Sequence, residues 1–113
     1  MKTYHEDRPW GTFDQFTRNE VSTVKLLYIK MGQTLSLQYH NHRAEFWRVI
    51  SGNPEITIGD NVVIGHPEDE FSIPLHAQHR IAAPTDDVCI LEISTGVFDE
   101  SDIVRIDDVY HRT

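Results

Sequence analysis

Apolar and polar side chains alternate with a period of two along most of this chain, which is the pattern that half-buried β-strands produce. Runs of this kind, separated by turns rich in glycine, proline, asparagine and aspartate, cover residues 23–29, 35–42, 45–50, 55–58, 62–64, 71–73, 79–83 and 88–94. About eight or nine short strands at this spacing predict an all-β sandwich or barrel, not alternating strands and helices. Only residues 99–108 are expected to include a short helical turn, with Asp99 or Ser101 as its N-cap.

The length and the charge of the chain narrow its class. Its 113 residues, of which 39% are apolar, suffice for one hydrophobic core, so we expect a single domain over residues 1–113. The chain has ten Lys and Arg residues and 18 Asp and Glu residues, so its net charge is −8. This charge argues against nucleic acid or an anionic membrane surface as a partner. A signal-peptide pattern is lacking and the single cysteine, Cys89, excludes an internal disulfide, so the chain is expected to be cytoplasmic.

Five polar residues have the side chains that metal sites use. In an extended segment, Gln38, His40 and His42 point to one side because successive side chains alternate between the two faces. Glu45 follows after a short break, and His79 begins another predicted strand. Imidazole, amide and carboxylate groups suit a divalent metal ion such as Zn, Mn, Co, Ni or Fe. The spacing alone fits an exposed polar face equally well, so both interpretations stay open at this point.

A wider motif surrounds these residues. The run GQTLSLQYHNHRAEFWRVISG at residues 32–52 resembles the first metal motif of the cupin superfamily. More narrowly, the chain resembles the type II phosphomannose isomerase domain, which usually forms the C-terminal part of bifunctional mannose-1-phosphate guanylyltransferase/phosphomannose isomerase proteins. Further segments resemble that family in the same order, at residues 8–11, 73–80, 91–93 and 102–110. The resemblance implies a cupin double-stranded β-helix, a jelly-roll barrel, and together with exposed edge strands it implies a homodimer.

The same resemblance implies a metal shell that contains His40, Glu45 and His79. Cupin spacing between the framing glycines adds Gln38 as a ligand, whereas His42 is the better ligand for a borderline metal. Both alternatives stay open.

Four positions depart from the family pattern. Asn41 and Phe46 stand where the family commonly has further histidines, and His76 and Ala83 replace the glycine and asparagine of the general second motif. We expect Asn41 and Phe46 to alter the surroundings of the metal, which tune its affinity and the orientation of a substrate.

The resemblance also implies a reaction, the interconversion of mannose 6-phosphate and fructose 6-phosphate. Moving a proton between C1 and C2 through an enediol requires a Lewis acid, a base beside the carbon and a cation for the distant phosphate. Glu92 is the candidate base if it points into the barrel, although an exposed strand glutamate fits its position as well. Arg43, inside the motif, is the candidate clamp for the sugar phosphate.

Two other functional classes remain open. One is a cupin that binds a metal or a sugar without catalysis, and the other is a different small-molecule enzyme on the same scaffold, such as a dioxygenase or another sugar isomerase.

The remaining large and charged side chains are interpreted as structural. Trp10, Trp47, Phe71 and Phe98 are expected to fill the core or a subunit contact. The acidic segment 99–108 is expected to be solvated or to pack in a dimer.

Overall fold

A computed structural model describes residues 3–112, and over this range it contains β-strands and turns but no α-helix. The all-β class predicted from the alternation is therefore confirmed. No helix in this range is long and apolar enough to cross a membrane. The strands are β1 (Tyr4–Arg8), β2 (Gly11–Gln15), β3 (Ser22–Ile29), β4 (Leu37–Tyr39), β5 (Arg43–Ser51), β6 (Glu55–Ile58), β7 (Asn61–Ile64), β8 (Glu70–Ile73), β9 (His79–Ala82), β10 (Val88–Gly96) and β11 (Val104–Asp107).

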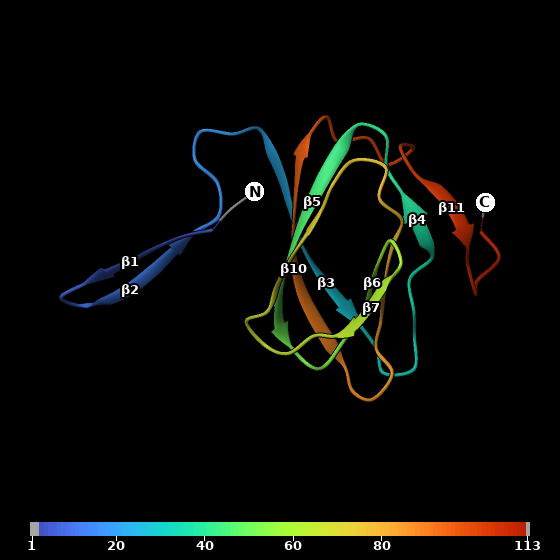
Figure 1. Cartoon of the computed structure of the whole chain (residues 1–113), viewed down its shortest axis with the longest axis horizontal. Coiled ribbons are helices and arrows are strands. Elements are labelled where there is room, and N and C mark those ends of the chain that lie inside the picture. The colour runs from blue at the N-terminus through green and yellow to red at the C-terminus, as the bar shows by residue number, and fades with distance from the viewer. Residues whose placement is uncertain (1–2, 113) are drawn as a thin grey trace.

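Two antiparallel sheets form the body of the molecule (Figure 1). One has the strand order β3-β10-β5-β8, and the other has the order β11-β4-β9-β6-β7. Both sheets contribute to one core, because antiparallel sheets bury one face and leave the other to solvent. The buried core side chains are Ile29, Trp47, Ile56, Ile73, Ile81, Ala83, Val88 and Ile90. This enclosed space between the sheets also holds the polar residues described below.

Strand β3 buries the face that contains Lys25 and leaves its more apolar face exposed to solvent. Ile29 is buried and Leu27 packs against the core, whereas Leu26 and Tyr28 are 51% and 74% exposed. Alternation therefore turns Lys25, which shares a face with Leu27, toward the interior.

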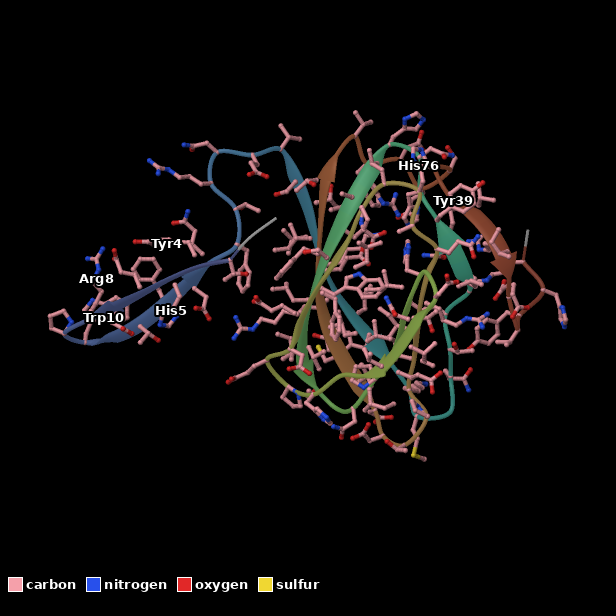
Figure 2. All side chains as sticks on the ribbon, viewed as in Figure 1. Tyr4, His5, Arg8, Trp10, Tyr39 and His76 are labelled. Atoms are coloured by element: carbon pink, nitrogen blue, oxygen red, sulfur yellow. The ribbon has the colours of Figure 1, made fainter. Side chains whose placement is uncertain are left out.

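A separate hairpin of β1 and β2 projects from the body (Figures 1 and 2). The alternation did not predict these strands, because polar residues occupy most of their positions. Trp10 lies at the tip of the hairpin, is 72% exposed and stacks on Phe13 with ring centroids 6.5 Å apart. It does not enter the core of this chain, in contrast to Trp47, which is buried there.

The prediction of a helical turn in residues 99–108 is wrong. The chain makes one tight turn, in which the Asp102 N–H donates to the Asp99 carbonyl over 2.9 Å. Asp99 does cap this turn, since its carboxylate accepts the Ser101 N–H. No helix follows because the next residues enter β11, which pairs with β4.

Candidate metal centre

Three buried side chains converge between the two sheets. The possible ligand atoms of His40, Glu45 and His79 all lie within 4.8 Å of one another. Glu45 Oε1 is 2.7 Å from His40 Nε2 and 3.5 Å from His79 Nε2. All three side chains are 2% exposed, so water does not satisfy their polar atoms.

Both sheets are needed to assemble this group. Glu45 lies on β5, where it alternates with outward residues and shares the inner face with Trp47. His40 follows β4 directly, and His79 opens β9. Residues more than thirty positions apart in sequence therefore meet because the sheets pack face to face.

Backbone hydrogen bonds fix the tautomers of both imidazoles. His40 Nδ1 lies 2.5 Å from the Asp102 carbonyl oxygen, and His79 Nδ1 lies 2.9 Å from that of Ala77. A carbonyl oxygen only accepts, so each Nδ1 carries the hydrogen. Each Nε2 is then a lone-pair atom directed at the Glu45 carboxylate, unless the ring is protonated.

This arrangement fits a divalent cation. Glu45 Oε1 and His79 Nε2 are buried without a hydrogen bond, so acceptor atoms face one another with no donor between them. The other Glu45 oxygen accepts the Trp47 Nε1–H over 3.2 Å, which orients the carboxylate. Two imidazole nitrogens and one carboxylate oxygen are the donor set that borderline divalent metals prefer.

Asp102 supports the centre, and sequence reasoning missed it. Its carboxylate accepts the backbone N–H groups of Asn41 and His42, both over 2.9 Å, while its carbonyl binds His40. The expectation that the segment 99–108 is solvated or packs in a dimer is therefore wrong for Asp102, which is 9% exposed because it is buried within this chain. The sequence carries no signal for this contact, because it joins residues about 60 positions apart.

Gln38 and His42, the two alternatives for a further ligand, differ in their position relative to His79 and to solvent. The strand expected over residues 35–42 ends at Tyr39, because the Asp102 carboxylate holds the following residues in a bend. His42 is consequently exposed and does not share a face with His40. Gln38 pairs directly with His79 in the β4–β9 register, although its Oε1 accepts the Ser36 hydroxyl over 2.6 Å. Neither residue belongs to the converging group.

Glu92 points into the barrel beside Glu45. It is 8% exposed, which excludes the exposed strand glutamate as an interpretation. Burial, followed by the hydrogen bond and charge of Glu45, raises the pKa of Glu92 to about 8. Burial alone would also raise the pKa of Glu45, but its close polar contacts with His40 and His79 outweigh burial and hold that pKa well below its ordinary value.

Arg43 brings a buried cation to the same place. Its Nη2 lies 3.4 Å from His40 Nε2 and its Nε lies 3.7 Å from Glu45 Oε1. Its Nη1 donates to the Asp99 carbonyl, and its guanidinium lies over the Phe98 ring. The structure therefore places Arg43 and Glu92, the two predicted catalytic residues, next to the converging group.

The positions that depart from the family pattern lie mostly away from this group. Phe46 faces the outer side of β5 and packs against Phe16, with ring centroids 5.8 Å apart. The expectation that Phe46 alters the metal surroundings is thus wrong, since Glu45 and Phe46 point to opposite faces. Asn41 and His76 are exposed, and the His76 N–H donates to the His40 carbonyl.

A surface hollow lies elsewhere. It has a volume of about 510 Å³ and is lined mainly by apolar side chains of β3 and β10, among them Leu26 and Val88. It includes none of the three converging residues, so it plays no part in the proposed chemistry.

Together, the two facing antiparallel sheets and the buried histidine–glutamate group define a cupin. The structure of NovW, a 4-keto-6-deoxy sugar epimerase from Streptomyces spheroides, superposes with a TM-score of 0.71 at 11% sequence identity, over 92% of this chain and 66% of that one. At this identity the likeness shows the fold alone. It confirms the predicted cupin fold.

Sequence comparison gives the family. Residues 1–108 match the family model described as "Mannose-6-phosphate isomerase C-terminal", and the chain belongs to this family. It is 41% identical to "Xanthan biosynthesis protein XanB" of Xanthomonas campestris pv. campestris (strain B100), over 98% of this chain and 25% of that protein. It is 36% identical to "Mannose-1-phosphate guanylyltransferase ManC" of Salmonella typhimurium, over 93% of this chain and 22% of that protein. The chain thus spans about a quarter of the length of these relatives.

Proposed function

We propose that this chain is a metal-dependent isomerase that interconverts mannose 6-phosphate and fructose 6-phosphate. The observation that carries the proposal is the buried, converging group of His40, Glu45 and His79, in which Glu45 Oε1 and His79 Nε2 make no hydrogen bond, in a chain of the mannose-6-phosphate isomerase C-terminal family. Arg43 and Glu92, buried beside this group, supply a cation and a proton-transfer residue.

His40, Glu45 and His79 would hold a divalent metal ion. When bound, such an ion polarises the carbonyl and hydroxyl oxygens of a sugar as a Lewis acid. Gln38 is the nearer candidate for a further ligand, because residues paired directly in an antiparallel register have neighbouring side chains and its partner is His79.

Glu92 is the proposed residue for proton transfer. In the aldose-to-ketose direction the C2–H bond breaks and its proton passes to a Glu92 carboxylate oxygen, from which it returns to C1. The proton of the C2 hydroxyl moves to the C1 oxygen, so the product is an isomer and nothing else is consumed. Glu92 suits this step by its place, since it is buried on the inner face of β10, away from competing water.

Arg43 is the proposed cation for the negative charge of the substrate. Its guanidinium is held by the Asp99 carbonyl and the Phe98 ring, so it is oriented before a ligand arrives.

The test is conversion of mannose 6-phosphate to fructose 6-phosphate by the purified chain, treated with chelator and then supplied with single divalent metals. We expect no turnover with chelator, recovery with at least one metal, and no recovery in Glu45→Gln. The matched control is His5→Gln, which removes an exposed histidine from the hairpin and should turn over like the unaltered chain. A metal-loaded chain without turnover would refute the isomerase proposal and favour a binding cupin or another substrate.

A further inference from the structure

A second cation, Lys25, shares an aromatic ring with Arg43. The Lys25 Nζ lies 4.4 Å from the centroid of the Phe98 ring, and the Arg43 Cζ lies 4.5 Å from the same centroid. Cations are attracted to the face of an aromatic ring, so Phe98 holds both side chains without neutralising either charge.

Strand register places Lys25 on the inner wall of the barrel. Lys25 pairs with Glu92 across β3 and β10, and Glu92 pairs with the buried Trp47 across β10 and β5. Directly opposite residues share a face, so this row of side chains faces the interior. Lys25 lies two strands from Glu45 and therefore about 10 Å across the sheet from the converging group.

Two buried donors near this wall make no hydrogen bond. Arg43 Nε and Ser94 Oγ are buried without a hydrogen bond, and Ser94 pairs with Glu45 in the register of the same sheet. An N–H and an O–H both donate, so an oxyanion accepts from both, which a cation or an apolar group cannot do.

The ion pair between Lys25 and Glu100 shows that an oxyanion can reach Lys25 from solvent. Lys25 Nζ donates to a carboxylate oxygen of Glu100 over 3.1 Å, and the Glu100 side chain is 78% exposed on the turn after β10. An exposed pair of this kind is weak, so a ligand that makes several contacts displaces it.

The charges of the site favour a dianion. Glu45 and Glu92 together carry at most two negative charges, against four positive charges from Lys25, Arg43 and a bound divalent metal, so at least two positive charges are uncompensated. A phosphate monoester, with a charge of about −1.5 to −2 at neutral pH, matches this excess.

We propose that Lys25, Arg43 and the Ser94 hydroxyl form the subsite that binds the phosphate group of the substrate, with Phe98 as the residue that positions the two cations. This inference rests on the proposed function and adds Lys25, Ser94 and Phe98 to it. A free sugar, which lacks the phosphate, gains nothing from these groups.

The test compares Lys25→Gln with Lys30→Gln, which removes an exposed lysine just after β3 and serves as the matched control. Inorganic phosphate is titrated into the zinc-loaded full chain and followed by 31P NMR. We expect Lys25→Gln to weaken phosphate binding by about 10-fold or more, the effect of one lost charge-assisted hydrogen bond, and to leave zinc affinity unchanged. Equal phosphate affinity in the two variants overturns the subsite, because the metal alone would then hold the phosphate.

Kinetics separate this inference from the proposed function. If mannose 6-phosphate turns over, Lys25→Gln should raise KM more than it lowers kcat, and an unchanged KM overturns the subsite while the isomerase stands. If phosphate binding depends on Lys25 but no turnover occurs, the isomerase fails and the subsite stands.

The role of Phe98 is tested by the KM of two Phe98 variants. Phe98→Leu should raise KM a few-fold through Lys25 and Arg43, whereas Phe98→Tyr, which keeps the ring, should restore it. Equal KM values in the two variants would remove Phe98 from the subsite.

Discussion

Two clusters of histidine and carboxylate groups in this molecule have the same chemistry and different surroundings. On the projecting hairpin, His5 binds Asp14 and Asp7 through its two ring nitrogens, over 2.6 Å and 3.1 Å, and is 55% exposed (Figure 2). In the barrel, His40 and His79 use Nδ1 for a backbone carbonyl and direct Nε2 at Glu45 Oε1, a buried carboxylate oxygen without a hydrogen bond. Burial and unsatisfied lone pairs, more than residue type, therefore distinguish a metal centre from a surface ion pair.

The largest difference between the barrel cluster and the hairpin cluster is expected in metal affinity. His79→Ala removes one of three converging ligands and should lower metal affinity by at least about 100-fold, whereas His5→Ala should leave it unchanged. Isothermal titration calorimetry with Zn or Co measures both variants. Equal losses in the two variants would show that the barrel cluster is not the metal site.

Substitutions in the barrel core should also lower the free energy of unfolding more than substitutions on the hairpin. Ile90 is fully buried in the core, so Ile90→Ala should lower the free energy of unfolding by about 2–5 kcal/mol. Trp10→Ala at the exposed hairpin tip should change it by less than about 0.5 kcal/mol. Urea denaturation provides the values, and a Trp10 effect as large as that of Ile90 would mean that the hairpin packs on something within the folded assembly.

A smaller effect is expected from the residue that holds the bend before Arg43. Asp102→Ala keeps the backbone carbonyl that binds His40 Nδ1 but frees the N–H groups of Asn41 and His42, so the bend that positions His40 loosens and metal affinity should fall by about 10-fold. Asp86→Ala is the control, since its carboxylate also accepts one backbone N–H, that of Asn53, far from the metal group. If the control reduces metal affinity equally, Asp102 has no specific part in orienting His40.

The smallest effect concerns the hairpin cluster itself. Hydrogen bonds to Asp14 and then to Asp7 raise the pKa of His5 above its ordinary value of 6.5. The pair therefore stabilises the hairpin below pH 6.5, and this contribution disappears as the pH rises through the raised pKa. An NMR titration should show His5 changing charge above pH 6.5 and, in Asp14→Asn, closer to that value. Titration of the unaltered chain at or below pH 6.5 contradicts the pairing.

The sequence predicted the barrel better than the hairpin for a physical reason. Strands such as β5 and β10 bury one face, and burial imposes the alternation from which they were predicted. The hairpin strands bury little, and cross-strand pairs such as His5 with Asp14 hold them together, so they leave no hydrophobic period.

The candidate site was predictable only where local spacing determines it. His40, Glu45 and His79 stood in motifs, and the structure brings them together. An extended segment predicts His42 on the same face as His40, whereas the distant Asp102 bends the chain there. Lys25 and Ser94 entered only through strand register, which a single sequence does not contain.

The most direct test of the central claim is one titration that follows bound metal and turnover together. Cobalt is added stepwise to the metal-free chain, and conversion of mannose 6-phosphate is measured at each step. The proposed centre predicts that turnover rises in proportion to bound metal and stops rising at one equivalent per chain, and that His79→Ala abolishes both. Turnover in the metal-free chain, or a fully loaded chain without turnover, would contradict it.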